Sequence, residues 1–370
     1  MKAIFHNDSR GWGGYQKWIL TLAQGLSARG HEVVVACHAG SPLGHSLREA
    51  GIRTEDRHPG ADVNLPKAVR FRRWLRREKP DALVLTAWRR TFWAGWAARS
   101  AEVPRVVARL GILEPVYTRP DRRFGMRYWL DGVIVNTPEI KEHWLRSVPG
   151  FPPDDMHVIL NGVGTAVPDP AALRAELGIA SDEPIVVGAG RLVEQKGFDL
   201  LLDAFAGVKR PGVHLVIAGE GEEEAELRAH ADRLGVAGRV HWLGFRSDVR
   251  AVLAAADIFA LSSRREGMAN VMLEAMAVGT PVVAVEVSGV REALGSEGDG
   301  TAAGWIVPPC NPNALAAALD GVLAALAGQP ESVRLRTEEA RRRVVERFGV
   351  ERMIRETEAV LFGPVAGGAQ

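Results

Sequence analysis

DIFALSSRREGMANVMLEAMAVGTPVVAV (257–285) contains two short apolar runs with a helical pattern between them. The runs DIFALS (257–262) and PVVAV (281–285) consist mainly of aliphatic and aromatic residues and do not alternate with polar ones. Continuous apolar runs of this length are typical of parallel strands whose sheet is covered on both faces. Parallel neighbours need a crossover, which the helix near 268–278 provides. This stretch therefore predicts a βαβ unit.

The same pattern extends in both directions along the chain. In the second half, strands are predicted at PIVVGAG (184–190), VHLVIAG (213–219), RVHWLG (239–244) and GWIVP (304–308), with helices near 196–207, 222–234, 247–254, 312–327 and 331–347. In the first half, strands are predicted at 2–6, 31–37, 81–86, 104–109, 132–136 and 156–160 and more weakly near Ile52, with helices at 15–28, 64–78 and after Pro138. Two consecutive series of this kind predict two doubly wound sheets.

The turn Asn161-Gly162-Val163-Gly164 and the prolines that follow it separate the two series. We therefore expect a Rossmann-like domain at 1–164 and a second one at 165–347. A terminal helix at 348–362 is expected to cross back to the first domain, and a tail at 363–370 to be disordered. The predicted fold class is α/β, with the two domains facing a central cleft, where ligands commonly bind.

Composition excludes several classes of protein. The chain has 370 residues, 46% hydrophobic and 25% charged, which is typical of globular domains and not of disordered chains. The net charge is +1, but residues 1–165 carry +9 and the remainder −8, and eight of the ten Trp lie in the first part. Two cysteines, an N-terminal apolar run too short for a signal peptide, and no 18-residue apolar stretch predict a cytoplasmic protein.

Glycine-rich turns follow several predicted strands and are candidate anion sites. Gly13 and Gly14 precede the first helix, and Gly219 ends the strand VHLVIAG. Such glycines let backbone N–H groups approach an anion at a helix N-terminus, although a turn without a ligand is an equal alternative for Gly13 and Gly14 and equally open for Gly219. The first turn is not G-x-G-x-x-G, and Cys37-His38 stands where a dinucleotide site needs an acidic residue. A dehydrogenase is therefore disfavoured.

Two cations lie where a strand passes into a helix. Arg191 follows PIVVGAG, and Lys196 is expected to begin the next helix. A planar guanidinium and a compact ammonium together suit a diphosphate. The alternative is a solvated pair neutralised by Glu194.

Two carboxylates, Glu266 and Glu274, stand eight residues apart in the pattern E-x7-E. Glu266 follows the strand DIFALS, and Glu274 lies in a helix whose other residues are largely apolar. Because a buried carboxylate needs a partner, a surface position for Glu274 is the weaker alternative. The free N–H groups of Gly267, Met268, Ala269 and Asn270 at the start of that helix suit sugar hydroxyls or a phosphate.

Together these motifs resemble those of the family-4 retaining glycosyltransferases. The resemblance rests on the Arg191/Lys196 pair, the run EGMANVMLEAMAVGTPVVA (266–284) and the Asn161-Gly162-Val163 turn, and it covers nearly the whole chain. It implies the GT-B architecture of two Rossmann-like domains. It also implies a hexosyltransferase-type enzyme that moves a sugar from a nucleotide-diphosphate donor with retention of anomeric configuration.

The resemblance implies a role for each matching residue. Arg191 and Lys196 would bind the diphosphate, Glu266 and the backbone at 267–270 the sugar, and Glu274 the ribose. Gly13 and Gly14 would line the phosphate from the first domain, and Phe245 and Arg246 would lie near the base. UDP-sugars are the favoured donors, and GDP-sugars are possible. No cofactor is expected, and the absence of an Asp-x-Asp pair predicts no metal at the diphosphate.

The chain departs from many relatives on the acceptor side. Leu110 stands where a histidine is common, and the first turn reads GGYQ rather than GGAE. Trp88, Arg89 and Arg109 are the acceptor-side candidates. The first two follow a predicted strand of the first domain, and Arg109 ends another. Basic residues with aromatic neighbours, as at 67–77, suit an anionic membrane or an acidic glycan, and a solvated helix packed on the sheet is an equal alternative.

We therefore expect transfer to a glycan or lipid-linked acceptor in cell-envelope polysaccharide or lipopolysaccharide synthesis. The enzyme would be cytoplasmic, with possible contact to the inner face of the plasma membrane and no nucleic-acid partner. A sugar-nucleotide epimerase and a non-catalytic glycan-binding or nucleotide-sugar-binding protein are the alternatives.

Overall fold

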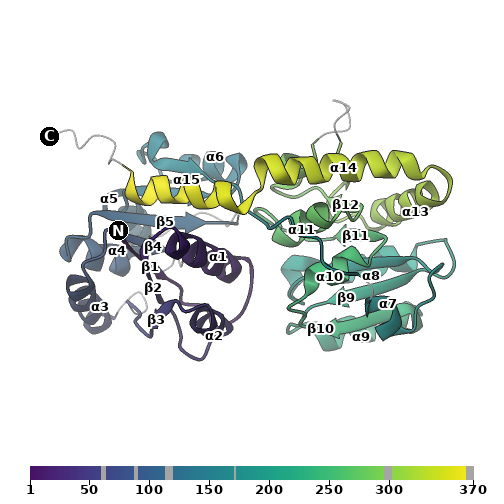
Figure 1. Ribbon diagram of the computed structural model, residues 1–370, viewed down its shortest axis with the longest axis horizontal. Helices are drawn as coiled ribbons and strands as arrows, with labels where there is room; N and C mark the ends of the chain where they lie inside the picture. Colours follow the sequence, from purple (N-terminus) through teal and green to yellow (C-terminus); the bar gives the residue numbers. More distant parts are fainter. Residues whose placement is uncertain (60–63, 87–90, 113–119, 171, 296–301, 364–370) are drawn as a thin grey trace. The chain divides into compact units, whose positions relative to one another are not determined.

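The computed structural model describes the chain except residues 60–63, 87–90, 113–119, 171, 296–301 and 364–370. The chain divides into two compact units. Unit 1 comprises Met1–Asn161 and Val350–Gln370, and unit 2 comprises Gly162–Gly349. Each unit has its own parallel sheet between helices (Figure 1), which confirms the predicted α/β class with two domains. Of the predicted tail at 363–370, all but the first residue lies outside the described residues.

The sheet of unit 1 has the strand order β3-β2-β1-β4-β5-β6-β7, and all of its pairings are parallel. Its strands are β1 (Lys2–His6), β2 (Glu32–Ala36), β3 (Arg53–Glu55), β4 (Ala82–Leu85), β5 (Arg105–Leu110), β6 (Gly132–Val135) and β7 (Met156–Val158). Its helices are α1 (Gly14–Ala28), α2 (Pro42–Glu49), α3 (Leu65–Glu78), α4 (Thr91–Ser100), α5 (Pro120–Trp129), α6 (Pro138–Ser147) and α15 (Val350–Phe362).

The sheet of unit 2 repeats this winding in the order β10-β9-β8-β11-β12-β13, again with parallel pairs. Its strands are β8 (Ile185–Ala189), β9 (His214–Ala218), β10 (Val240–Gly244), β11 (Ile258–Leu261), β12 (Val282–Val285) and β13 (Trp305–Val307). Its α-helices are α7 (Ala172–Leu177), α8 (Phe198–Ala206), α9 (Glu224–Arg233), α10 (Val249–Ala254), α11 (Asn270–Val278), α12 (Val290–Leu294), α13 (Pro312–Gly328) and α14 (Pro330–Arg347). Short 3-10 turns lie at Pro153–Asp155 (η2), Glu194–Lys196 (η3) and Ala237–Arg239 (η4).

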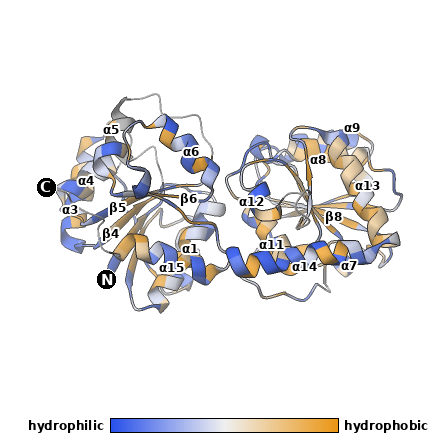
Figure 2. Ribbon diagram, turned by 90° about the horizontal axis from the view of Figure 1, so that it is seen from above, coloured by the Kyte–Doolittle hydropathy of each residue, from blue (hydrophilic) through white to orange (hydrophobic). Residues whose placement is uncertain are grey.

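The strands are apolar throughout because both faces of each sheet are covered. In β1, Ile4 packs into the core that contains α3 to α6, while Ala3 and Phe5 pack into the core with α1, α2 and α15. This is the alternation of side chains that a strand imposes. Figure 2 shows the apolar strands inside each unit and more polar residues on the outer faces of the helices.

The aromatic residues of α3 belong to the core. Phe71 and Trp74 are buried, whereas the cations Arg70, Arg73 and Arg77 of the same helix are exposed. The alternative of a helix that packs its aromatic face on the sheet is therefore the observed one. Its solvent face is strongly basic.

Candidate active site

The predicted site residues of unit 2 follow the carboxyl ends of two adjacent strands. Strands β8 and β11 are neighbours, yet the chain leaves β8 toward β9 on one side and β11 toward β12 on the other. Such a reversal of strand order is where open parallel sheets bind ligands. Arg191 and Lys196 follow β8, and Glu266 follows β11. The winding alone therefore brings these residues to one place.

Glycines allow the loops at this edge to approach closely. A Cβ at Gly219 would lie 1.8 Å from the carbonyl oxygen of Gly190, and one at Gly197 would lie 2.3 Å from that of Ser262. Gly197 also has a φ of 62°, which disfavours other residues. The turn η3 therefore packs directly against the loop after β11. Lys196 ends this turn and α8 begins at Phe198, so Lys196 precedes the helix that it was expected to begin.

Lys196 and Glu266 form an ion pair at this contact. Lys196 Nζ donates to Glu266 Oε1 at 2.5 Å, and Ser263 Oγ donates to the same oxygen at 2.8 Å. The Glu266 side chain is 7% exposed and that of Lys196 18%. Because a buried carboxylate is costly without a cation, the pair fixes the position of both side chains.

A second ion pair holds the loop after β11 against η3. Arg264 donates two hydrogen bonds to the Asp199 carboxylate, at 2.7 and 2.5 Å, and one to the carbonyl oxygen of Glu194. Burial raises the pKa of Asp199, but the hydrogen bonds and charge of Arg264 outweigh it and leave the pKa below its usual value. Arg264, Asp199 and Ser263 were not predicted as site residues from the sequence, although Ser263-Arg264-Arg265 directly follows the predicted strand 257–262.

Arg191 differs from these paired residues. Its side chain is exposed, and within the described part of the chain it has neither an ion pair nor a hydrogen bond. A cation held at a strand end beside fixed charges is available to an anionic ligand.

Glu274 is buried, with 3% of the residue exposed. It lies in the second turn of α11, which begins at Asn270 rather than near 268. Gly267, Met268 and Ala269 form the buried loop before this helix, and Ala269 supplies no side-chain cap to its first N–H groups. The surface alternative for Glu274 is therefore wrong.

The two residues predicted near the base are differently placed. Phe245 is 55% exposed, and its N–H donates to Glu220 Oε1 at 3.2 Å. Arg246 pairs with Asp248 and Glu176, and hydrogen bonds to both carboxylates raise its pKa. Arg246 is thus already neutralised within unit 2.

In unit 1, Gly13 and Gly14 lie where the turn after β1 passes into α1, and Arg109 is the last residue but one of β5. Gly13 is the extended N-cap of α1, and Gly14 is its first residue. Arg109 is 3% exposed and donates to Asn161 Oδ1 at 2.8 Å. Its guanidinium lies over the rings of Trp18 and Tyr15, at 4.3 and 4.8 Å from their centroids. Burial lowers the pKa of Arg109 to about 10, against the raising effect of Tyr15. Trp88 and Arg89 lie outside the described residues.

Comparison with known proteins identifies the family. Residues 12–167 match Glycosyltransferase Family 4, and residues 169–342 match Glycosyl transferases group 1. The lipopolysaccharide core biosynthesis glycosyltransferase LpsE of Rhizobium meliloti (strain 1021) is 34% identical over 293 residues, which cover 75% of this chain and 77% of LpsE. The chain belongs to the family-4 glycosyltransferases.

Two further likenesses extend over different lengths of this glycosyltransferase. The D-inositol 3-phosphate glycosyltransferase of Mycobacterium sp. (strain JLS) is 40% identical over 174 residues, which cover 44% of this chain and 39% of that one. The crystal structure of HepE from Anabaena with UDP and glucose has a TM-score of 0.84 at 24% identity and covers 98% of this chain and 99% of HepE. This likeness confirms the GT-B fold.

The family membership confirms the resemblance that the motifs predicted. The glycosyltransferase activity follows from it, and a dehydrogenase is excluded. Across the described residues, no helix of this glycosyltransferase combines the length and apolar character that crossing a bilayer requires.

Proposed function

We propose that this glycosyltransferase uses a nucleotide-diphosphate sugar, with UDP as the favoured nucleotide, and transfers the sugar to a cell-envelope glycan with retention and without a metal at the diphosphate. One observation supports the donor site above all others. Arg191, which has no side-chain partner among the described residues, lies at the strand-order reversal, where the Lys196–Glu266 pair is already fixed. A cation without an internal partner beside a held ammonium is suited to a diphosphate.

The same residues would supply the electrostatics of transfer. As the bond between the sugar and the phosphate breaks, negative charge develops on the departing diphosphate. Arg191 and Lys196 would stabilise that charge, which is commonly the largest catalytic effect in such reactions. In front-face transfer, the departing phosphate oxygen accepts the acceptor's proton, so retention needs no separate base. Glu266 would orient the sugar and Glu274 the ribose, since carboxylates accept hydrogen bonds from hydroxyl groups.

Metal independence follows from this assignment. The full sequence has no Asp-x-Asp pair, and Arg191 with Lys196 would neutralise the diphosphate in place of Mg²⁺ or Mn²⁺. We expect transfer to persist in EDTA and not to rise when Mg²⁺ or Mn²⁺ is added. A rate that falls in EDTA and returns with Mg²⁺ would show that the two cations do not have this role.

The favoured nucleotide and acceptor derive from relatives. HepE has been solved with UDP-glucose, and LpsE is named for lipopolysaccharide core biosynthesis. We propose a UDP-sugar donor, with GDP-sugars as the alternative, and a lipopolysaccharide-type glycan acceptor. The exposed cations of α3 would bring the enzyme to anionic lipid at the inner face of the cytoplasmic membrane. Sedimentation with anionic and neutral vesicles tests this last step: equal recovery in both supernatants would contradict it.

The donor site can be tested with matched variants. Thermal-shift measurements with UDP-, GDP- and ADP-sugars should give the largest shift for UDP. The shift should be lost in Glu274→Ala, and in Arg191→Ala the affinity should fall about 10- to 100-fold, as for a hydrogen bond to a charged group. Arg355→Ala is the control, because Arg355 is exposed on α15 in unit 1. An Arg191→Ala enzyme that binds donor like Arg355→Ala would refute the assignment.

Product analysis tests the stereochemistry of transfer and the two alternatives that the sequence left open. A new glycosidic bond of unchanged anomeric configuration supports retaining transfer. An altered donor sugar without transfer would indicate an epimerase, and donor binding without turnover would indicate a non-catalytic binding protein.

A further inference from the structure

Five titratable side chains gather at the carboxyl ends of three neighbouring strands in unit 1. His6 ends β1 and Asp8 follows it, His38 follows β2, and Asp56 and His58 follow β3. These strands are adjacent in the order β3-β2-β1, so the winding brings their ends together. No role predicted from the sequence and no role proposed above uses these residues.

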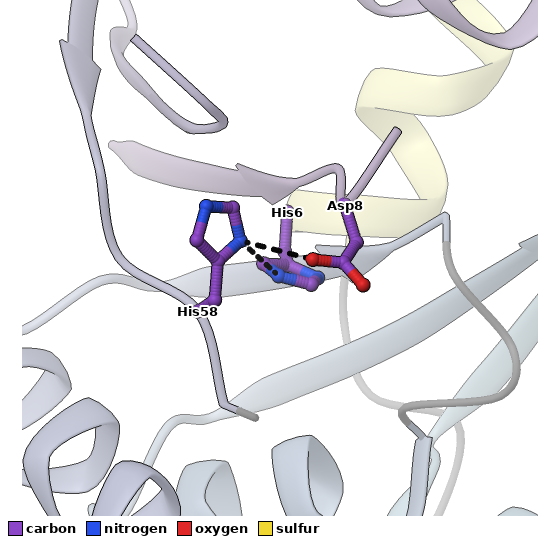
Figure 3. A group of neighbouring side chains, drawn as sticks. All are labelled: His6, Asp8 and His58. Carbon is purple, nitrogen blue, oxygen red and sulfur yellow. Dashed lines mark hydrogen bonds and ion pairs between the residues drawn. The ribbon is translucent and has the colours of Figure 1, made fainter. Parts of the chain in front are cut away.

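The atoms of three of these residues converge. His58 Nδ1 lies 3.4 Å from His6 Nε2 and 3.4 Å from Asp8 Oδ1. Figure 3 shows the two rings and the carboxylate close together, with His58 on a different segment from His6 and Asp8. One ligand atom from each residue lies within 4.8 Å of the other two. In a tetrahedral zinc site, ligand atoms about 2.0–2.1 Å from the ion are about 3.3 Å apart. The two separations from His58 Nδ1 therefore match edges of such a site.

A carboxylate lies on the far side of the His58 ring. Its Nε2 lies 3.2 Å from Asp56 Oδ1. No hydrogen bond joins this nitrogen to a described residue, but the negative charge of Asp56 favours the neutral tautomer that carries its proton on Nε2. The lone pair then lies on Nδ1, which is the atom that faces His6 and Asp8. This carboxylate–imidazole arrangement is the usual second shell of protein metal sites.

The burial and the charge of these side chains favour a bound cation over a bound anion. His6 is fully buried, and the side chains of Asp8 and His58 are 20% and 15% exposed. His38 adds a third imidazole, with its Nε2 at 3.6 Å from Asp8 Oδ1 and its ring centroid 4.1 Å from that of His58, the two rings tilted by 33°. An anion would meet the carboxylates of Asp8 and Asp56, whereas a divalent cation is attracted by both.

We propose that His6, Asp8 and His58 bind a divalent transition-metal ion, with Zn²⁺ the best match, and that Asp56 orients His58. Two nitrogens and one oxygen suit Zn²⁺, Co²⁺ or Ni²⁺ better than Mg²⁺, which prefers oxygen ligands. Three protein ligands leave a fourth position open to water or to a ligand atom. The proposed diphosphate cations belong to unit 2, so this proposal and the donor site can fail separately.

The test uses the full chain without a histidine tag, stripped with chelator. Zn²⁺ is titrated in competition with a chromogenic chelator, and Co²⁺ binding is followed by its visible d–d absorption. We expect one equivalent of metal per chain. If the stripped protein binds neither Zn²⁺ nor Co²⁺, the proposal is wrong, and the side chains of the cluster interact only with one another.

Variants locate the ion. His58→Gln and Asp8→Asn should abolish the binding of one Zn²⁺ per chain. Asp56→Asn should lower the Zn²⁺ affinity about 10- to 100-fold, which is the usual effect of changing a residue that orients a metal ligand. The control is His241→Gln, because His241 Nε2 lies 3.0 Å from His214 Nδ1 in unit 2 and forms a comparable imidazole pair. Circular dichroism checks that each variant is folded. Wild-type binding by His58→Gln and Asp8→Asn, or equal loss in His241→Gln, would refute the site.

Discussion

At the scale of single residues, two neighbouring cations of unit 2 have opposite structural roles. Lys196 is mostly buried and paired with Glu266, whereas Arg191 is exposed and has no internal partner among the described residues. Removing one member of a buried pair leaves the other charge without compensation, and removing an exposed side chain rarely affects stability. Substitutions at these two residues should therefore have different effects on stability, although both should lower transfer.

We expect Lys196→Ala to lower both transfer and the free energy of unfolding, the latter by about 2–4 kcal/mol. Arg191→Ala should lower transfer while the free energy of unfolding stays within about 0.5 kcal/mol of the wild type. Urea unfolding and donor-dependent transfer measure the two effects. Adding Glu266→Gln to Lys196→Ala should recover part of the stability but not the activity, because it removes the unpaired charge. Equal free energies of unfolding for the two single variants would show that the Lys196–Glu266 pair does not stabilise the fold.

At the scale of elements, most of the secondary structure follows from the sequence. The strand 257–262 was predicted and β11 is Ile258–Leu261, because a continuous aliphatic run has few alternatives between two helices. Helix 268–278 begins two residues later than predicted, because periodicity does not define the cap. Periodicity also could not reveal the ion pair between Arg264 and Asp199, or the proximity of His6, Asp8 and His58. Such contacts join segments distant in sequence, and only the strand order brings them together.

One ion-pair cluster joins three elements of unit 1. Glu78 of α3 accepts hydrogen bonds from Lys2 of β1 at 2.6 Å and from Arg53 of β3 at 2.8 and 2.9 Å. The hydrogen bonds of Arg53 and Lys2 lower the pKa of Glu78 from 4.5 to about 2, although burial acts in the opposite direction. A carboxylate with a lowered folded-state pKa stabilises the fold above its unfolded pKa and loses this effect as pH falls.

The contribution of the ionised Glu78 to the free energy of unfolding should therefore be complete above pH 5. It should disappear as the pH falls from about 4.5 to 2. Glu78→Gln should cost about 1 kcal/mol at pH 7, a modest figure because solvent screens the pair. The difference between the wild type and this variant should shrink at pH 3. Urea unfolding at pH 7, 5 and 3 measures it, with Glu49→Gln, an exposed position on α2, as the control. A difference that does not change with pH would contradict the role of these hydrogen bonds.

At the scale of the whole molecule, the last helix of the chain belongs to the first unit. Helix α15 contributes Met353, Ile354 and Leu361 to the core that contains α1 and β1. Ile354 lies directly over Gly25 of α1, where a Cβ would be 2.2 Å from its Cδ1 atom. At the same surface, Glu358 accepts hydrogen bonds from Arg29 at 2.8 Å and pairs with His31 at 2.6 Å. The apolar contact and the ion pairs together fix α15 on α1.

Because each unit has its own core, a defect in α15 should weaken unit 1 and leave unit 2 unchanged. Ile354→Ala removes buried atoms and should cost about 2–4 kcal/mol, most of it in unit 1. In hydrogen-exchange measurements, amides of α1, β1 and α15 should then exchange faster, while those of β8 and β9 keep their wild-type rates. Val345→Ala is the control, since Val345 is 66% exposed on α14. Faster exchange of equal size in β8 and β9 would show that the two units unfold together, so that α15 stabilises the whole chain rather than the unit it packs against.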